Sequence, residues 1–110
     1  MNPNLQRISH VEESILTVLN SYELYGLEII DAVEAGSGGK LKLGYGTVYP
    51  TLRRLEDKEF VQGRRGEDTP EERQGALKKY CKVTPEGAKV LHELQQLRAS
   101  LKAWKPASLA

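Results

Sequence analysis

The chain has 110 residues, a formal net charge of +1 and a single cysteine. This length fits one domain with a modest core, and 28% charged with 39% apolar residues is typical of a folded, soluble protein. The sequence excludes a membrane span, because no run of about 18 apolar residues occurs, and an internal disulfide or cysteine-based zinc site, because Cys81 stands alone.

The first two predicted elements are helices. One covers Ser9 to about Asn20, where apolar residues recur at helical spacing. Ser9 and Glu12 fit the Ser-x-x-Glu capping box that begins many helices. A second helix is predicted over 25–35, and the glycine-rich run 36–39 ends it.

The segment 40–43 alternates polar and apolar residues, which predicts a very short strand. A third helix then extends to Lys58, and the sequence leaves its start open. If Thr47 is the N-cap, Pro50 falls in the first turn, where its missing N–H costs little. If Gly44 is the N-cap, Pro50 lies deeper and should distort the helix.

The third helix has an apolar and a polar face. The apolar face holds Tyr45, Val48, Leu52 and Leu55. At the helical rotation of 100° per residue, the opposite face holds Thr47, Pro50, Arg53, Arg54 and Asp57, with Tyr49 on the boundary. An Arg there can bind guanine with two hydrogen bonds or neutralise a phosphate, and a Thr can contact phosphate or a thymine methyl.

Two strands are predicted over 60–65 and 77–83, joined by the polar segment 66–76. They form a hairpin whose long cationic side chains can bind phosphates. These are Arg64, Arg65, Arg73, Lys78, Lys79 and Lys82. Acidic residues in 67–72 should repel phosphate, so we expect the strands to bind DNA rather than the tip.

Thr84, Pro85 and Glu86 predict the start of a fourth helix, with an N-cap, a first-turn proline and a first-turn acid. Its apolar residues repeat at spacings of three and four up to Trp104, and Pro106 ends it. Such a repeat is typical of a seam between two helices. The partner is the first helix, a second chain, or both. We predict a homodimer whose interface contains Val11, Ile15, Val90, Leu94, Leu97, Leu101 and Trp104.

The order ααα-ββ-α predicts a mainly α fold with a small β-hairpin wing, the winged helix-turn-helix. Residues 1–83 would form its DNA-binding part, and 84–106 a dimerisation helix continuous with it. In this architecture the third helix enters the major groove of double-stranded DNA. A two-fold dimer predicts a palindromic site.

The near-neutral total charge conceals an uneven distribution. Residues 1–39 carry one positive and six negative charges, 40–83 carry eleven and seven, and 84–110 carry four and two. The region predicted to bind DNA is therefore basic, although a solvated surface explains many single lysines equally well.

Five stretches in order along residues 11–95 carry a family resemblance. They are 13–19 (Glu-Ser-Ile-Leu-Thr-Val-Leu), 25–30 (Tyr-Gly-Leu-Glu-Ile-Ile), 46–56 (Gly-Thr-Val-Tyr-Pro-Thr-Leu-Arg-Arg-Leu-Glu), 79–80 (Lys-Tyr) and 83–87 (Val-Thr-Pro-Glu-Gly). The sequence resembles the PadR-like family of bacterial transcriptional regulators. The resemblance implies a winged helix, a homodimer joined through the C-terminal helix, and repression at promoter DNA.

The resemblance also places Thr47, Tyr49 and the basic residues of the third helix at the DNA face. The DNA-binding residues we predict are Thr47, Tyr49, Pro50, Arg53, Arg54, Arg64, Arg65, Lys78 and Lys79. Some relatives respond to phenolic acids or drugs near the dimer interface, which makes a small aromatic effector a candidate partner. Trp104 would line such a pocket, although packing is the commoner role of such a residue. Glu59 stands where the family often has glycine, which predicts a strained or differently shaped turn before Phe60.

The sequence predicts no enzyme, cofactor or metal site. His10 and His92 lie on different helices, and the glycine run 36–39 lacks the Lys-Ser/Thr of a phosphate loop. Cys81 has lysines nearby that would lower its pKa. Its two candidate roles are therefore a redox sensor and, more commonly for such a residue, an inert buried thiol.

The alternative function is a winged-helix module that binds protein instead of DNA. The N-terminus has no signal pattern, so we expect a cytoplasmic protein.

Overall fold

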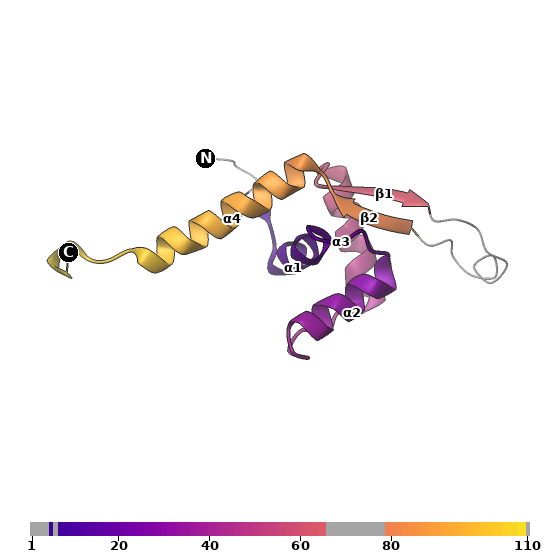
Figure 1. Ribbon diagram of the computed structural model, residues 1–110, viewed down its shortest axis with the longest axis horizontal. Coiled ribbons are helices and arrows are strands. Elements are labelled where there is room, and N and C mark those ends of the chain that lie inside the picture. The colour runs from indigo at the N-terminus through magenta and orange to yellow at the C-terminus, as the bar shows by residue number, and fades with distance from the viewer. Residues whose placement is uncertain (1–4, 6, 66–78, 110) are drawn as a thin grey trace.

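The computed structural model describes residues 5, 7–65 and 79–109. It has four helices and a two-stranded hairpin, a mainly α winged-helix architecture in the predicted order (Figure 1). The elements are α1 (His10–Leu19), α2 (Gly26–Gly36), α3 (Tyr45–Asp57), β1 (Val61–Arg65), β2 (Lys79–Val83), α4 (Pro85–Ala103) and a 3₁₀ turn (Ala107–Leu109). The predicted hairpin tip over 66–76, with Arg73, and the predicted start of the second strand, with Lys78, lie outside the described residues.

The helix starts follow local capping chemistry. The Glu12 N–H donates to Ser9 Oγ over 3.1 Å and the Ser9 N–H donates to Glu12 Oε1 over 3.0 Å, which confirms the predicted capping box. At α4 the Gly87 N–H donates to Thr84 Oγ1 over 3.0 Å, as the predicted N-cap requires.

Gly44 is the N-cap of α3, which decides between the two predicted starts. Pro50 therefore lies in the second turn and inside the helix. Because proline has no N–H, the carbonyl of Gly46 receives no helical hydrogen bond from it.

The hairpin is antiparallel, with Val61 opposite Val83 and Arg65 opposite Lys79. The predicted strand over 40–43 is wrong, since these residues have no strand structure. Instead, Leu24, which precedes α2, forms an isolated antiparallel β-bridge with Cys81 of β2. Its N–H donates to the Cys81 carbonyl over 3.0 Å and its carbonyl accepts from the Cys81 N–H over 2.7 Å. A single residue leaves no alternating pattern in the sequence to reveal it.

The turn from α3 into β1 is a Schellman motif. The Phe60 N–H donates to the Leu55 carbonyl, and the Glu59 N–H donates to the Glu56 carbonyl, both over 2.9 Å. This geometry needs a left-handed residue, and Glu59 occupies it with φ 64°, the only positive φ of a non-glycine residue in the described part of the chain. Of the two outcomes predicted for the turn before Phe60, strain is therefore the one found.

The core lies between α1, α2, α3, the base of the hairpin and the first half of α4. Gly87 brings α4 close to the turn after α3, because a Cβ there would lie 2.1 Å from the Phe60 carbonyl oxygen. Beyond Leu94, α4 has no buried residue and extends away from the body, opposite the hairpin (Figure 1). The molecule is consequently elongated, 66 × 29 × 22 Å. Within the described residues, no helix has the length and apolarity needed to cross a membrane.

Candidate nucleic-acid interface

The two faces of α3 have different environments. Val48, Leu52 and Leu55 are buried in the core, as predicted. The other face is exposed, and it contains Thr47, Tyr49, Pro50, Arg53 and Arg54. Tyr45 departs from the prediction, since it is 53% exposed instead of packed with the apolar face. Burying the three aliphatic residues anchors α3 and leaves its polar side open to a partner.

Arg53 and Arg54 are available cations on this face. Arg54 Nη2 donates to Thr51 Oγ1 over 3.0 Å, which directs its guanidinium along the helix. Within the part of the chain that the structure describes, neither arginine forms an ion pair. Both keep the hydrogen-bonding capacity that phosphate or guanine contact requires.

Tyr49 is held between two elements. Its ring stacks on that of Tyr45, with centroids 5.7 Å apart and planes at 9°. Its hydroxyl end lies against Gly26 at the start of α2, where a Cβ would be 2.7 Å from the phenolic oxygen. The missing side chain of Gly26 therefore creates the space that Tyr49 occupies.

Two of the predicted wing cations are already paired with carboxylates. Arg64 binds Glu23, with Nε 2.8 Å from Oε1, and its guanidinium lies 5.1 Å from the centre of the Tyr80 ring. Lys79 binds Glu56 of α3, with Nζ 2.8 Å from both carboxylate oxygens. Sequence reasoning missed both pairs, because the partners are 41 and 23 residues apart.

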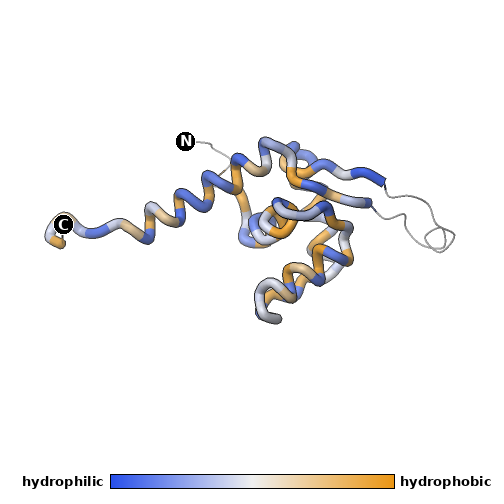
Figure 2. The backbone as a smooth tube through the Cα atoms, in the orientation of Figure 1, coloured by the Kyte–Doolittle hydropathy of each residue, from blue (hydrophilic) through white to orange (hydrophobic). Residues whose placement is uncertain are grey.

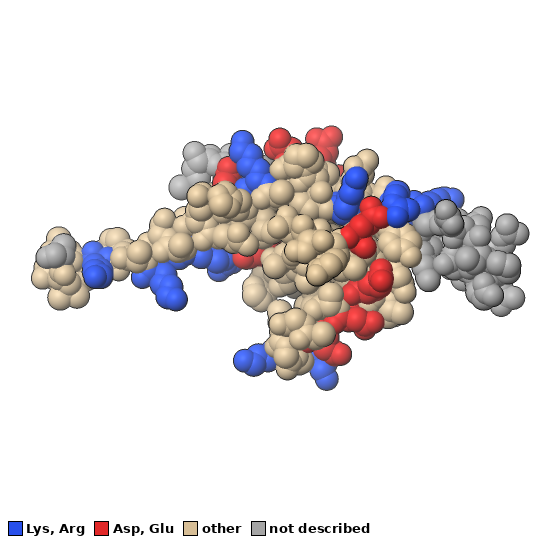
Figure 3. Space-filling model, in the orientation of Figure 1, with Lys and Arg blue, Asp and Glu red and all other residues tan. Residues whose placement is uncertain are grey.

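The Lys79 side chain reaches Glu56 by passing over Gly63, where a Cβ would lie 2.3 Å from its Cε. Arg65, the last residue of β1, is exposed. Figure 3 shows Lys and Arg side chains gathered at the hairpin end and acidic side chains over α2. The wing strands are thus basic, but carboxylates of the same chain, Glu23 and Glu56, neutralise part of their positive charge.

A cavity of about 200 Å³ lies between α3 and β2, lined by Tyr49, Leu52, Arg53, Glu56, Lys79 and Cys81. The Cys81 thiol is buried, and burial, reinforced by the Glu56 carboxylate, raises its pKa to about 11. Lys79 lowers this pKa, as the sequence suggested for the neighbouring lysines, but by less. A thiol with a raised pKa carries little thiolate, so the environment does not favour a redox sensor.

The residues predicted for the dimer interface fall into two groups. Ile15, Val90 and Leu94 are buried in the core of this chain, so they offer little surface to a second chain. Val11 and Leu97 are half-buried, while Leu101 and Trp104 are 68% and 72% exposed. Figure 2 shows apolar residues recurring along the part of α4 that leaves the body.

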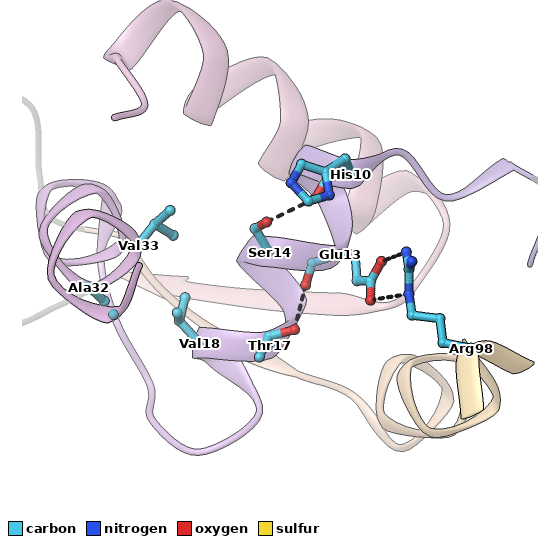
Figure 4. A pocket seen from close by; sticks show the side chains of 9 residues that line it. His10, Glu13, Ser14, Thr17, Val18, Ala32, Val33 and Arg98 are labelled. Carbon is cyan, nitrogen blue, oxygen red and sulfur yellow. Dashed lines mark hydrogen bonds and ion pairs between the residues drawn. The ribbon is translucent and has the colours of Figure 1, made fainter. Parts of the chain in front are cut away.

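A groove of about 320 Å³ lies beside this part of α4, between α1 and α2 (Figure 4). Its walls include Thr17 and Val18 of α1 and Ala32 and Val33 of α2. At one end Arg98 of α4 forms a bidentate ion pair with Glu13 of α1, with Nε 3.0 Å from Oε2. The hydrogen bonds to Glu13 raise the pKa of Arg98, so this cation stays charged.

The chain is similar in sequence and in structure to known proteins. The profile of the transcriptional regulator PadR-like family matches residues 15–93. An uncharacterised protein of Lysinibacillus sphaericus is 27% identical over 93 residues, covering 84% of this chain and 82% of its own length.

Among solved structures, a PadR-like transcription factor of Bacteroides fragilis superposes with a TM-score of 0.75. It is 29% identical, and the match covers 88% of this chain and 87% of that one. Bacillus subtilis PadR, solved in complex with operator DNA, is 23% identical with a TM-score of 0.67, over 89% of this chain and 51% of that one. At that identity the second likeness concerns the fold alone.

Proposed function

The chain belongs to the PadR-like family of transcriptional regulators, a family of regulators and not of enzymes, and we propose that it represses transcription as a homodimer bound to a palindromic promoter site. In this proposal α3 enters the major groove of the DNA, and the wing strands lie along the sugar-phosphate backbone. Thr47, Tyr49, Pro50, Arg53 and Arg54 contact DNA from α3. Arg64, Arg65, Lys78 and Lys79 contact it from the wing.

One observation carries the DNA-binding part of the proposal. The exposed face of α3 presents Arg53 and Arg54 without ion pairs in the described residues, while its opposite face is locked into the core. Unpaired arginines on a rigid helix suit phosphate and base contact, because no internal ion pair has to break first. The operator complex of the structurally similar Bacillus subtilis PadR is consistent with this use of the fold.

The second half of α4 supports the dimer. Leu101 and Trp104 are large apolar side chains left exposed on the end of α4, beyond Leu94, the last residue of this helix buried in the core. An apolar strip of this kind is commonly buried against a partner. In the dimer, Leu97, Leu101 and Trp104 pack against the second copy, while Val11 contributes from α1. Trp104 is thereby assigned to packing between the two chains and not to an effector pocket.

Repression follows from occupancy, because a dimer bound across a promoter blocks access to it. The test is in-vitro selection of double-stranded DNA, followed by binding to fragments from the upstream region of the chain's own gene. We expect a palindromic site with half-sites about one or two helical turns apart. Recovery of no sequence preference would favour the alternative, a module that binds protein.

The dimer is tested separately by sedimentation of a Leu101→Asp, Trp104→Asp variant, whose changes lie outside the folded core. We expect a monomer with an unchanged helix content. Tyr22→Asp, a change at a tyrosine that is also largely exposed but lies outside α4, is the control and should remain dimeric. An unchanged mass for the α4 variant would show that the interface lies elsewhere.

A further inference from the structure

The first turn of α3 carries an aromatic pair that the core does not use. Tyr45 is the first residue of α3 and shares a helix face with buried Val48, yet 53% of it is exposed. Its ring stacks in parallel on that of Tyr49, one turn along, which is itself 50% exposed. The two rings form a continuous apolar ridge beside the exposed polar face of α3.

This ridge is ordered before any partner binds. α2 fixes Tyr49, because the space above Gly26 is filled by the Tyr49 phenol, whose Cζ lies 2.9 Å from where a Cβ would be. Tyr49 in turn supports one face of Tyr45. A side chain that is already ordered loses little conformational entropy on binding, so its contacts contribute fully to affinity.

The ridge also lies where bases are contacted in this architecture. The N-terminal residues of the helix in the major groove approach base edges. Arg53 follows Tyr49 by one more helical turn, and both residues line the cavity between α3 and β2, so a duplex that binds Arg53 passes the ridge. The apolar group that a base edge offers in the major groove is the 5-methyl of thymine, and aromatic rings contact it.

We infer that Tyr45, held in place by Tyr49, contacts a thymine methyl in each half-site and sets the preference for thymine at that position. The inference rests on the proposed binding of DNA through α3. The phenol hydroxyl is not needed for this contact, since the ring supplies the apolar surface.

The experiment compares sequences selected by the wild-type protein and by Tyr45→Ala. We expect one position per half-site to lose its preference for thymine in the variant. Uracil, which lacks only the methyl, is then placed at that position. The wild-type protein should bind the uracil site about fourfold more weakly, the effect of burying one methyl group. The ratio of the affinity for the thymine site to that for the uracil site should be the same for Tyr45→Phe as for the wild-type protein. For Tyr45→Ala this ratio should be near one.

Three outcomes would overturn the inference while leaving the proposed function intact. The first is that Tyr45→Ala selects the same sequences as wild type. The second is that it retains the thymine-to-uracil ratio. The third is that Tyr45→Phe weakens binding to all sequences equally, which would assign the hydroxyl to a phosphate. If the wild-type protein selects no DNA, the proposed function fails first. Tyr22→Ala is the matched exposed tyrosine and should change neither affinity nor sequence preference.

Discussion

The Nζ atom of Lys79 on β2 lies 2.8 Å from both carboxylate oxygens of Glu56 on α3. The wing strand and the helix proposed to enter the major groove are therefore joined by an ion pair at the surface that would face DNA. Such an exposed pair contributes little to stability, but it neutralises a cation in the proposed interface. Glu23 does the same to Arg64. Both carboxylates thereby weaken the attraction of the wing to phosphates.

Glu56→Gln should consequently strengthen DNA binding. Loss of the carboxylate leaves Lys79 free for phosphate, so we expect affinity at low salt to rise severalfold and the salt slope to steepen by about 0.9. Glu34→Gln removes the same charge from the exposed end of α2, where no ion pair involves this residue in the described structure, and serves as the control. Titration by fluorescence anisotropy measures both. Equal effects of the two variants would show that Lys79 makes no phosphate contact.

Glu59→Gly should stabilise the protein by about 0.5–1 kcal/mol. Glycine adopts the left-handed conformation of Glu59 without steric cost, which outweighs the greater entropy that it gives the unfolded chain. Glu59→Ala keeps the strain and should leave stability nearly unchanged. The backbone carbonyl that accepts from Thr84 Oγ1 over 2.6 Å is retained in both variants. Chemical denaturation measures the difference, and a less stable glycine variant would contradict it.

Gly87→Ala should destabilise the protein by about 1–3 kcal/mol. Its Cβ would overlap the Phe60 carbonyl oxygen at 2.1 Å, so α4 has to move from the turn after α3. Gly36→Ala is the matched change, because a Cβ at Gly36 meets nothing within 4 Å and alanine favours the helix. Thermal unfolding should separate the two variants in opposite directions. Similar melting temperatures of the two variants would show that the close approach of Gly87 to the Phe60 carbonyl does not contribute to stability.

Glu12 should make stability depend on pH in the acid range. Its burial opposes ionisation, but hydrogen bonds from Lys58 and Ser9 outweigh burial and lower the pKa of its carboxyl. A group whose pKa is lowered on folding stabilises above its unfolded pKa, about 4.3, and loses this contribution as the pH falls through the folded value.

Glu12→Gln keeps the geometry of the capping box but removes the charge. We therefore expect it to be less stable than wild type near pH 7 and to lose less stability below about pH 4.3. Denaturation at a series of pH values tests this. Parallel profiles for the two proteins would indicate that the Glu12–Lys58 pair, 2.9 Å apart, does not link protonation to folding.

Local signals in the sequence predicted most of this fold. The capping residues Ser9 and Thr84 begin their helices as expected, because they act on amides only three residues away. The turn at Glu59 was singled out only by the family resemblance, which led us to expect glycine there, and Glu59 has the positive φ that glycine favours. The predicted strand over 40–43 is absent, because four alternating residues without a neighbouring strand have nothing to pair with.

The candidate site was predictable only in part. Arg53 and Arg54 were predicted on the exposed face from helical periodicity alone, and the structure leaves both exposed. Their DNA contact stays a prediction. Periodicity placed Tyr45 in the core, whereas stacking on Tyr49 holds it outside. The pairing of Arg64 with Glu23 depends on how the segment before α2 lies beside β2, whose Tyr80 stands opposite Arg64, and only the three-dimensional arrangement reveals this.

The central claim is that the exposed face of α3 binds DNA through its arginines. The most direct measurement is the affinity for the selected site as a function of salt, for the wild-type protein and for Arg54→Ala. We predict that log K falls linearly with log salt, by about 0.9 for each phosphate neutralised. Arg54→Ala should cost about 1–3 kcal/mol if this residue contacts a base. Binding that does not respond to salt and is unchanged in Arg54→Ala would contradict the account.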